Sequence, residues 1–312
     1  MRLKLPRYTK ESELTMAQAR DRPKVSIHII SYNQQDFIAE ALESALAQNY
    51  PNLEVIVSDD GSSDSTPAIV GDFASRHPDR LVALLNPDNL GITRNSNRGL
   101  RACTGEFISF MGGDDVLLPD KISRQVAWFG QNPRRVLCGH QLEVFYDDHS
   151  RAPHPFSAKL RQGRGASEFI REEAFGAVAT MVRANAIPPW GFDERLPSIS
   201  DLALWVDVLS GGGEYGFVDA TLARYRKHAA NVTNEGLRMA AEYQLHIELI
   251  AERHPQYCAD CRYAYIHHVL YYQGVQLLRA GRKYEARARF AKALVARPLF
   301  LKSWARLAQS LA

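Results

Sequence analysis

The segment Gly105–Ile122, GEFISFMGGDDVLLPDKI, decides the fold prediction because it joins an apolar run to a pair of acidic side chains. Its first part, Glu106–Met111, has the length and the aromatic and β-branched content of a strand buried inside a sheet. Two glycines then allow a sharp turn, and the adjacent carboxylates Asp114 and Asp115 follow. Paired carboxylates at the carboxyl end of a buried strand suit a divalent cation that carries phosphates. A solvated acidic turn before a helix near Pro119 would explain the same residues.

Three further apolar runs precede this segment and predict strands at Val25–Ile30, Leu53–Val57 and Leu81–Leu85. The first run is nearly continuous rather than alternating in its apolarity, which indicates burial on both faces, as in a parallel sheet, and we interpret the second run as another buried strand. Polar residues follow the first two runs, including Ser31–Asn33 and Asp60, and helical patterns separate the strands. The alternation predicts a doubly wound α/β fold with a nucleotide-sized ligand at the strand ends. We interpret His28, inside the first run, as a core or cleft residue rather than a ligand.

The second half of the chain continues the strand and helix pattern less regularly. We expect a helix at Lys121–Phe129 and strands at Val136–Gly139 and Tyr215–Val218, with an apolar run of small residues at Ala177–Val182. A polar loop, Asp147–Gly165, could border an acceptor. A helix begins near Ile199–Trp205, and either Ser200 or Asp201 could cap it.

The pattern of the chain predicts three parts. Residues 1–22 form a polar arm, residues 23–235 the α/β domain, and residues 236–312 an all-helical extension. Within the extension, Gly and Ala residues fall at the spacing of one tetratricopeptide-like repeat. Residues 262–312 contain ten Lys and Arg side chains and a single acidic one, Glu285. A solvated basic face explains this charge best, and contact with an anionic membrane surface is the alternative.

Composition excludes several classes of protein. The 46% hydrophobic and 23% charged content is ordinary for a globular protein, and a net charge of +3 is too small to indicate nucleic-acid binding. No apolar run is long enough to span a bilayer, so we expect a cytoplasmic protein with at most peripheral membrane contact. Four cysteines suggest no disulfide framework. The pair Cys258 and Cys261 is more easily explained as two thiols packed on a helix than as a zinc site.

Five ordered segments of the chain resemble the family 2 inverting glycosyltransferases, which have the GT-A fold. The resemblance covers about residues 23–231. The segments are VSIHIISYNQQDFIAEALESALAQNYPNLEVIVSDDGSSDST, NLGITRNSNRGL, CTGEFISFMGGDDVLLPDKI, GFDERLPSISDLALWVDVL and YRKHAANVT. The resemblance implies a mostly parallel central sheet flanked by helices, and transfer of a sugar, typically a hexose, from a nucleotide-sugar donor, most often a UDP-sugar.

The resemblance also implies roles for individual residues. Asp201 matches the catalytic base, and Asp115 the main ligand of Mn²⁺ or Mg²⁺. Asp114 would meet the ribose or the metal, and His228 would be a further metal or phosphate contact. The donor nucleotide would be bound by the remaining positions, which are Ser31, Tyr32, Asn33, Asp60 and Asn95.

Two positions depart from the family pattern. The family often has a further Asp two residues before the adjacent pair, where this chain has Gly112. The usual Ala-Arg-Asn is replaced by Asn95-Ser96-Asn97, so Arg94 or Arg98 could substitute in contacts to the donor. The late segment also lacks the QxxRW motif of processive synthases. The pattern therefore favours transfer of one sugar to a glycan or lipid-linked acceptor, as in surface-polysaccharide assembly in bacteria.

Two other classes of function remain open on the sequence. A catalytically silent sugar-nucleotide-binding or scaffold protein would retain the fold without the chemistry. It is disfavoured because four carboxylates, Asp60, Asp114, Asp115 and Asp201, are all present. A nucleotidyltransferase would need a basic, glycine-rich loop after the first strand, and Ser31–Asp36 contains neither Gly nor Lys.

Overall fold

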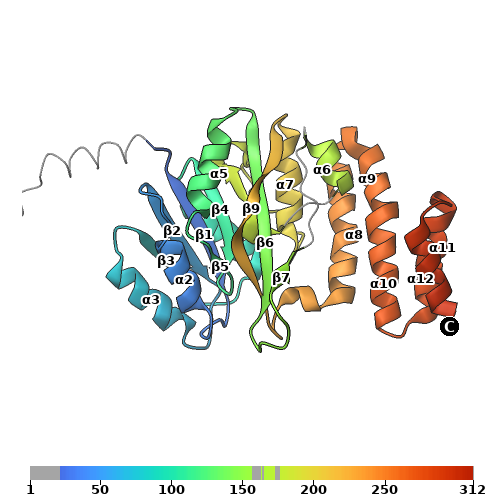
Figure 1. Cartoon of the computed structure of the whole chain (residues 1–312), viewed down its shortest axis with the longest axis horizontal. Helices are drawn as coiled ribbons and strands as arrows, with labels where there is room; N and C mark the ends of the chain where they lie inside the picture. Colours follow the sequence, from blue (N-terminus) through green and yellow to red (C-terminus); the bar gives the residue numbers. More distant parts are fainter. Residues whose placement is uncertain (1–21, 157–162, 164, 173–175, 312) are drawn as a thin grey trace, which may run out of the picture.

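The structure is a computed structural model, and it describes residues 22–156, 163, 165–172 and 176–311. The predicted polar arm, except Arg22, lies outside the described residues, as does part of the polar loop before Gly165. One mixed sheet forms the centre of the molecule, and a row of helices extends from one side of it (Figure 1).

The sheet contains nine strands. They are β1 (Val25–Ser31), β2 (Leu53–Asp59), β3 (Leu81–Leu85), β4 (Phe107–Gly112), β5 (Val116–Leu117), β6 (Arg135–Tyr146), β7 (His154–Pro155), β8 (Met181–Arg183) and β9 (Glu214–Lys227). Their order is β3-β2-β1-β4-β8-β6-β9-β5, with β7 paired to β6. The first four strands in this order are parallel, and β8 joins them antiparallel to β4. The predicted α/β fold with a mostly parallel central sheet is confirmed.

Burial of both faces explains the continuous apolar runs. All residues of β1 are buried except Ile30, and β4 is buried as far as Met111. His28 is a core residue, as expected: its ring lies 5.5 Å from that of Phe110 and 6.4 Å from that of Phe192, centroid to centroid. Burial lowers the pKa of His28 to about 4, so the ring is neutral.

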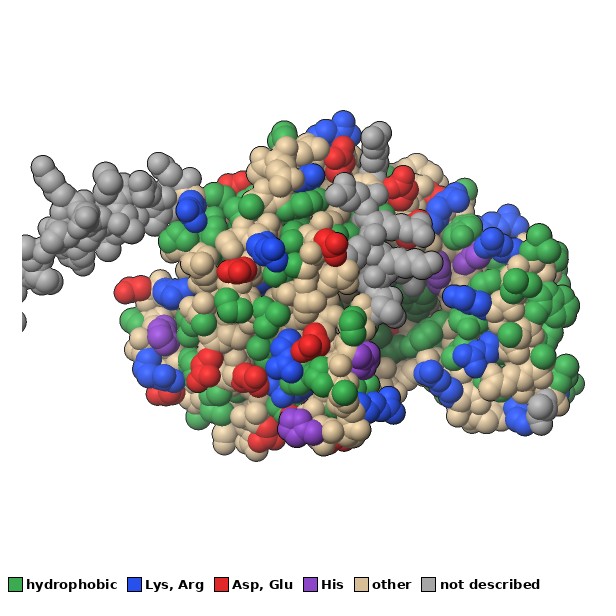
Figure 2. Space-filling model, viewed as in Figure 1, with side chains coloured by type: hydrophobic (Ala, Val, Ile, Leu, Met, Phe, Trp, Pro, Cys, Tyr) green, Lys and Arg blue, Asp and Glu red, His purple; other side chains and the backbone are tan. Residues whose placement is uncertain are grey.

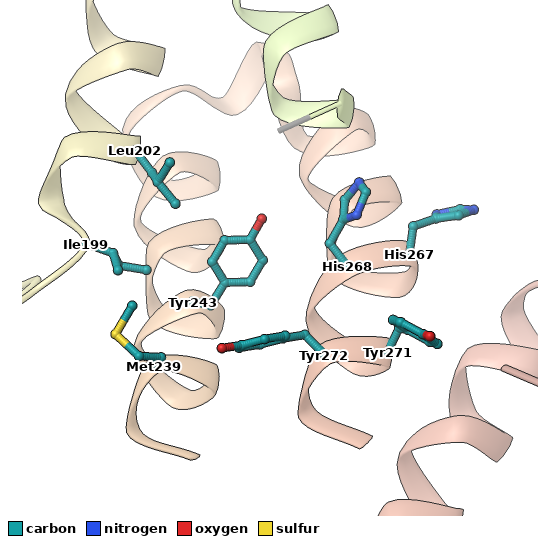
Figure 3. Close-up of a pocket in the computed structure, with 8 residues that line it drawn as sticks. All are labelled: Ile199, Leu202, Met239, Tyr243, His267, His268, Tyr271 and Tyr272. Atoms are coloured by element: carbon teal, nitrogen blue, oxygen red, sulfur yellow. The ribbon is translucent and has the colours of Figure 1, made fainter. Parts of the chain in front are cut away.

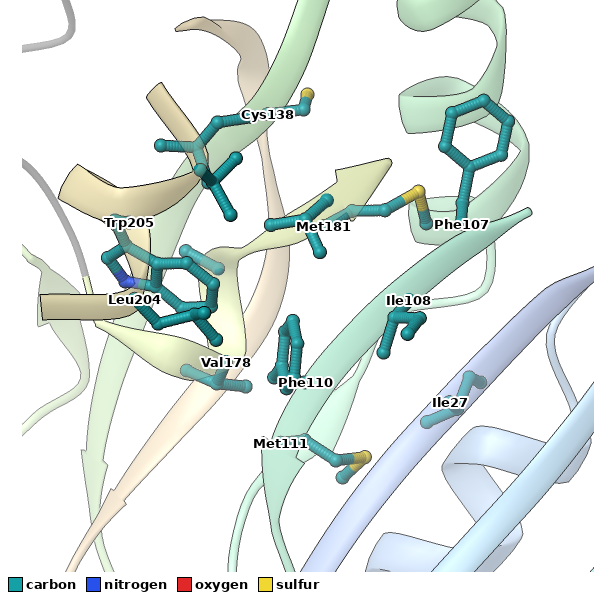
Figure 4. Close-up of a cluster of buried hydrophobic side chains, with 14 of the residues drawn as sticks. Ile27, Phe107, Ile108, Phe110, Met111, Cys138, Val178, Met181, Leu204 and Trp205 are labelled. Atoms are coloured by element: carbon teal, nitrogen blue, oxygen red, sulfur yellow. The ribbon is translucent and has the colours of Figure 1, made fainter. Parts of the chain in front are cut away.

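Helices connect and cover the strands of the α/β part. They are α2 (Ile38–Leu46), α3 (Thr66–Arg76), α4 (Ile92–Ala102), α5 (Lys121–Gly130), α6 (Ala166–Glu172) and α7 (Ser200–Ser210). Figure 4 shows the core where α7 meets the sheet, with Trp205 and Leu204 facing Phe110 of β4. The Trp205 and Phe110 rings make an edge contact with centroids 5.2 Å apart. This packing fixes the start of α7 beside the end of β4.

The C-terminal part is entirely helical, as predicted. It contains α8 (Gly236–Arg253), α9 (Cys258–Ala264), a π-helix (Tyr265–Val269), α10 (Leu270–Arg279), α11 (Lys283–Ala296) and α12 (Leu301–Leu311). These helices lie progressively farther from the sheet (Figure 1). Gly274 of α10 lets α11 approach closely, because a Cβ there would come within 2.4 Å of the Phe290 ring. The assignment of this hairpin to a tetratricopeptide-like repeat stays a prediction.

Candidate active site

The loops after β1 and β2 are tied together at the carboxyl end of the sheet. Ser31 donates a hydrogen bond to Asp59 (Oγ to Oδ2, 2.9 Å), and Ser63 N donates to the Asn33 side chain (2.9 Å). Asn33 has a φ of 49°, a left-handed conformation that Asn tolerates better than most residues. Tyr32 between them is 48% exposed, so its ring is available to a ligand.

Asp60 is buried at 3% exposure and holds the loop before α4. Its two carboxylate oxygens accept hydrogen bonds from the backbone N–H groups of Leu90 (2.8 Å) and Gly91 (3.0 Å). Asp60 therefore holds the loop before α4 beside the end of β2, and its contact with a nucleotide base stays a prediction.

Asn95 fastens α4 to β2. The side chain is 2% exposed, its Nδ2 donates to the Ser58 carbonyl (2.8 Å), and its Oδ1 accepts from Ser58 Oγ (2.6 Å) and Asn86 Nδ2 (3.0 Å). These bonds occupy the amide in a way that the sequence did not indicate. These bonds do not test the predicted contact of Asn95 with the donor nucleotide. They place the Asn95 side chain near the end of β2.

Asp114 and His228 meet, although they are far apart in the chain. His228 Nε2 lies 2.9 Å from Asp114 Oδ2, and Asn231 Nδ2 lies 3.4 Å from the same oxygen. The His228 ring also packs on Phe37, with centroids 4.7 Å apart. The structure therefore places these two predicted site residues side by side, and their contact with a metal or phosphate stays a prediction. Gly112 leaves room for Asp114, since a Cβ there would lie 2.4 Å from Asp114 Oδ1.

Arg226 is a residue that the sequence interpretation missed. Its side chain is 7% exposed, its Nε donates to the Asp114 carbonyl (2.8 Å), and its backbone N–H donates to Asp115 Oδ1 (3.1 Å). Glu40 and Asp147 neutralise the guanidinium. The Tyr225–His228 segment was noted only for its histidine, and a buried arginine at the end of a strand could have signalled the partner of the acidic turn.

Asp115 and Asp201 line the same cavity, which has a volume of about 590 Å³. Asp115 comes from the turn after β4, and Asp201 from the first turn of α7. Tyr225 and Lys227 of β9 line the cavity as well, and Lys227 Nζ donates to Thr233 Oγ1 (2.7 Å). The cavity has the size of a small-molecule site, ~300–1,000 Å³. It brings a metal-type carboxylate, a cation and a candidate base together.

Burial perturbs both cavity carboxylates. It raises the pKa of Asp115 well above its ordinary value, and the adjacent charge of Asp114 raises it further. Burial likewise raises the pKa of Asp201 to about 6, with a smaller contribution from the charge of Glu242. A carboxylate with a pKa near neutrality is a better proton acceptor than an ordinary aspartate. Perturbed carboxylates in a cavity are typical of a functional site.

The prediction that Ser200 or Asp201 caps α7 is wrong. Ile199 occupies the N-cap position, and no side chain caps the helix there. Asp201 instead accepts a hydrogen bond from the N–H of the next residue, Leu202 (2.9 Å). The loop before α7 is held by Glu242 of α8, whose Oε1 accepts from the N–H groups of Ser198 and Ile199, the latter at 2.7 Å.

Glu242 is a second residue that the sequence interpretation missed. It is 5% exposed, and its Oε2 has no hydrogen-bond partner among the described residues. Its spacing from Met239, His246 and Leu249 places it on the buried stripe of α8. A lone acidic residue on an otherwise buried stripe was the available signal.

The acidic turn fits a divalent cation by its chemistry. Asp114 and Asp115 are adjacent carboxylates, and a cation beside them would relieve the repulsion that raises the pKa of Asp115. The described residues contain no group of three or more His, Cys, Asp or Glu side chains that could bind a metal unaided. Mg²⁺-type ions usually bind one or two carboxylates together with substrate phosphates, so a pair suffices.

The two cysteines of the C-terminal part lie on α9, and neither forms a disulfide. Cys258 is exposed and Cys261 buried, and burial raises the pKa of Cys261 to about 11. The interpretation of these cysteines as two helix thiols agrees with this geometry. Among the described helices, none has the length and apolarity needed to cross a bilayer.

Comparisons with solved structures show the same fold in two proteins that were solved with nucleotide sugars. The TarS fragment 1–349 of S. aureus in complex with UDP-GlcNAc has a TM-score of 0.65 at 17% identity, covering 92% of this chain and 89% of that one. A mannosyltransferase of Pyrobaculum calidifontis, in complex with GDP-Man and Mn²⁺, has a TM-score of 0.62 at 20% identity and covers 94% and 81%.

Comparisons of sequence identify the family. The chain is 30% identical to an uncharacterised glycosyltransferase of Rickettsia prowazekii over 71% of this chain and 70% of the relative. It is also 30% identical to an uncharacterised protein of Mycobacterium tuberculosis, of which it spans 60%. The model of the family described as "Glycosyl transferase family 2" matches residues 26–187. The chain therefore belongs to glycosyl transferase family 2.

Proposed function

We propose that this protein transfers a single sugar, typically a hexose, from a nucleotide-diphosphate sugar to a hydroxyl group of a glycan or lipid-linked acceptor. The observation that carries the proposal is the shared cavity of Asp115 and Asp201, at the carboxyl ends of the parallel strands. A metal-type carboxylate and a proton acceptor on one cavity are the two groups that such a transfer needs.

The donor nucleotide would bind beside the ends of β1 and β2. Tyr32 is exposed enough to stack on a base, and Asp60 could accept a base N–H while it holds its loop. Ser31 and Asn33 would shape this pocket, and Asn95 would support it from α4. A UDP-sugar is the favoured donor, and the relatives with known ligands were solved with UDP-GlcNAc and with GDP-Man.

Asp114 and Asp115 would hold Mn²⁺ or Mg²⁺, and His228 would be a further metal or phosphate contact. When bound, the ion would offset the negative charge of the departing nucleoside diphosphate. Arg226 keeps the two carboxylates in place through its bonds to the Asp114 carbonyl and to Asp115. Lys227 lines the same cavity and supplies a further positive charge near the diphosphate.

Asp201 would act as the catalytic base. The acceptor hydroxyl loses its proton to the Asp201 carboxylate as its oxygen attacks the anomeric carbon, and the bond from that carbon to the diphosphate breaks. The pKa of about 6 leaves Asp201 charged at neutral pH and still basic enough to accept the proton. A single displacement of this kind inverts the anomeric centre, and it suits stepwise assembly of a cell-surface polysaccharide.

The second candidate is a catalytically silent sugar-nucleotide-binding or scaffold protein. It would bind the donor and recruit partners through the C-terminal helices. The shared cavity of Asp115 and Asp201 favours the enzyme, because a silent protein has no need of a buried carboxylate with a raised pKa.

The first experiment is a thermal-shift screen of UDP, GDP, dTDP and CDP with and without Mn²⁺. A ligand that binds only the folded protein raises the melting temperature. We expect a metal-dependent shift with one nucleotide in the wild type, lost in Asp115→Ala and kept in Asp79→Ala, which changes an exposed aspartate. No shift with any nucleotide would contradict the proposal.

Hydrolysis of the identified donor sugar then separates the two candidates. The enzyme should release free sugar slowly in the absence of acceptor, and Asp201→Asn should nearly abolish this release while keeping the nucleotide shift. Equal hydrolysis by the two proteins would favour the silent binding protein.

The C-terminal helices would also contact the inner face of a membrane at its surface. Large apolar side chains near the end of the chain are unusually exposed, at 84% for Leu299, 76% for Leu301 and 51% for Trp304. Lys302 and Arg297 lie beside them and are exposed as well. Apolar and basic side chains on one surface suit an anionic bilayer, which would bring the enzyme to a lipid-linked acceptor.

A further inference from the structure

A second cavity, of about 340 Å³, lies beside the active-site cavity and is built mostly by the C-terminal helices. One wall comes from the start of α7 and from α8, and the other from the π-helix and α10 (Figure 3). In the space-filling view, a hollow with hydrophobic side chains at its base separates the α/β part from the C-terminal helices (Figure 2). The residue roles assigned above leave this cavity without a function.

The two cavities are neighbours and share part of their lining. Ile199 and Met239 line both of them. Asp201 lines the larger cavity, and its neighbour Leu202 lines the smaller one. A single short segment of chain therefore separates the candidate base from the second cavity, and a molecule longer than one sugar could occupy both.

Aromatic rings dominate the second cavity. Tyr243, Tyr271 and Tyr272 line it, and all three are partly buried. Tyr243 of α8 and Tyr272 of α10 lie next to each other on its lining in an edge-on arrangement, with ring centroids 6.4 Å apart and planes at 67° (Figure 3). Tyrosine combines a flat apolar ring with a polar hydroxyl, which matches a sugar with its C–H faces and hydroxyl groups. An acyl chain would instead fit a mainly aliphatic lining.

The π-helix forms part of the cavity wall opposite α8. Single π-helical turns inside helices are rare and are frequent at functional sites. This turn carries His267 and His268, two consecutive residues that both line the cavity. Their rings are fixed: His268 Nε2 lies 2.7 Å from the Arg171 carbonyl, and His267 stacks on Tyr263 with centroids 3.7 Å apart. The wall is therefore formed before any ligand binds.

We propose that this aromatic cavity is an acceptor subsite that binds a sugar ring of the acceptor glycan next to the sugar that receives the transfer. The inference rests on the proposed function, since it takes Asp201 as the base that faces the accepting hydroxyl. It assigns the C-terminal helices a direct part in acceptor recognition and makes an oligosaccharide, rather than a monosaccharide, the preferred acceptor.

Saturation-transfer NMR tests the subsite with defined probes: lactose, maltose, cellobiose and N,N′-diacetylchitobiose. We expect the wild-type protein to transfer saturation to at least one disaccharide. The double variant Tyr243→Leu/Tyr272→Leu should weaken that binding at least tenfold, and Tyr243→Phe should retain it because the ring remains. Tyr284→Leu is the matched control, because Tyr284 is 85% exposed on α11. Circular dichroism melts verify that each variant folds.

Three outcomes would overturn the subsite. They are no saturation of any disaccharide by the wild type, equal binding by the double variant, and binding of an alkyl probe such as octanol that the double variant loses while no sugar binds. The nucleotide-dependent thermal shift tests the proposed function separately. A shift without disaccharide binding would remove the subsite alone, and disaccharide binding without a shift would remove the transferase.

Discussion

Burial of Asp201 favours its proposed role as a base and lowers the stability of the folded protein. Its carboxylate is partly buried at the wall of the cavity, and burial raises its pKa to about 6. The same burial that makes it a good proton acceptor makes its charged form costly to the fold. Residues with this conflict are expected at sites that serve the reaction rather than stability.

Replacement of the base should therefore abolish turnover. We expect Asp201→Asn to lower kcat by about 10²–10⁴, since that is the usual contribution of a general base. In the wild type, kcat/KM should fall below a pH of about 6, because the protonated carboxyl group cannot accept a proton. Transfer rates measured from about pH 4.5 to 8.5 test this dependence, and a flat pH profile through that range would contradict the assignment of Asp201 as the base.

The same substitution should stabilise the fold. The pKa of Asp201 rises from 3.8 to about 6 on folding, so the folded state binds the proton more tightly. Stability is therefore lost as the pH rises between these two values, and the full cost remains above pH 6. The melting temperature of Asp201→Asn should be higher than that of the wild type near neutral pH and the same near pH 3.8. The control Asp79→Asn should leave the melting temperature unchanged at both pH values.

At the residue scale, motif positions were predictable and their contacts were not. Asp114 and His228 were both predicted as site residues from the sequence, and the structure brings them within 2.9 Å. The amide of Asn95 holds α4 to β2, a contact that the sequence did not indicate, and its predicted contact with the donor stays a prediction. Glu242 and Arg226 were missed because their partners are distant in the chain, and pairing across such separations leaves no local pattern.

At the scale of elements, the inner parallel strands β1, β2 and β4 were predictable because both of their faces are buried. The edge strand β3 was recognisable from its apolar run, although most of its side chains are half-buried or exposed. β1, β2 and β3 follow their apolar runs closely. β6 and β9 are much longer than expected, since only Val136–Gly139 and Tyr215–Val218 were apolar enough to recognise. Their later halves pair with each other, so tertiary pairing rather than local composition determines their length.

Helix α8 positions the base through Glu242. In Glu242→Gln, the amide oxygen can still accept from Ser198 and Ile199, but the negative charge is gone. The pKa of Asp201 should fall, because the charge of Glu242 raises it, so the acid limb of kcat/KM should move to lower pH. Glu242→Ala should instead lower kcat by about tenfold or more, since misplacement of a reacting group is costly.

The pH profile distinguishes this role from simple structural support. A merely structural Glu242 would lower activity at every pH in both variants without moving the acid limb. Glu248→Gln is the matched control, because Glu248 lies on the same helix, is exposed and accepts a hydrogen bond from Gln244 one turn away. An unmoved limb in Glu242→Gln, with the transfer rate retained, would remove the electrostatic part of the argument.

Helix α4 packs on the sheet so closely that Gly99 has no room for a side chain. A Cβ at Gly99 would lie 2.3 Å from His28 Nε2, inside the core. We expect Gly99→Ala to lower the free energy of unfolding by about 1–3 kcal/mol, the usual cost of overpacking. Gly71→Ala on α3 meets nothing within 4 Å, so helix propensity should make it stabilising by about 0.5–1 kcal/mol. Urea unfolding of both variants measures the contrast, and two effects of the same sign would contradict it.

At the scale of the whole molecule, residues that come after the family match, including Met239 of α8, form part of the cavity wall. The family match ends at residue 187, yet Asp201, Lys227 and Met239 line the cavity that contains Asp115. α8 both holds the loop of the base and forms a wall shared by the two cavities. The shared part therefore supplies the metal-type carboxylates, and the later part supplies the proposed base and the proposed surroundings of the acceptor.

The end of the chain should bind anionic membranes. In sedimentation assays, the wild type should bind vesicles with one-third anionic lipid, bind neutral vesicles weakly, and lose binding at high salt because exposed charges are screened. Leu299→Ser/Leu301→Ser should weaken the binding, since these side chains are 84% and 76% exposed beside Lys302. Val82→Ser/Leu85→Ser, at the far edge of the sheet, is the matched control. Equal binding to neutral and anionic vesicles, or an equal loss of vesicle binding in the two double variants, would show that these helices do not form a membrane-binding surface.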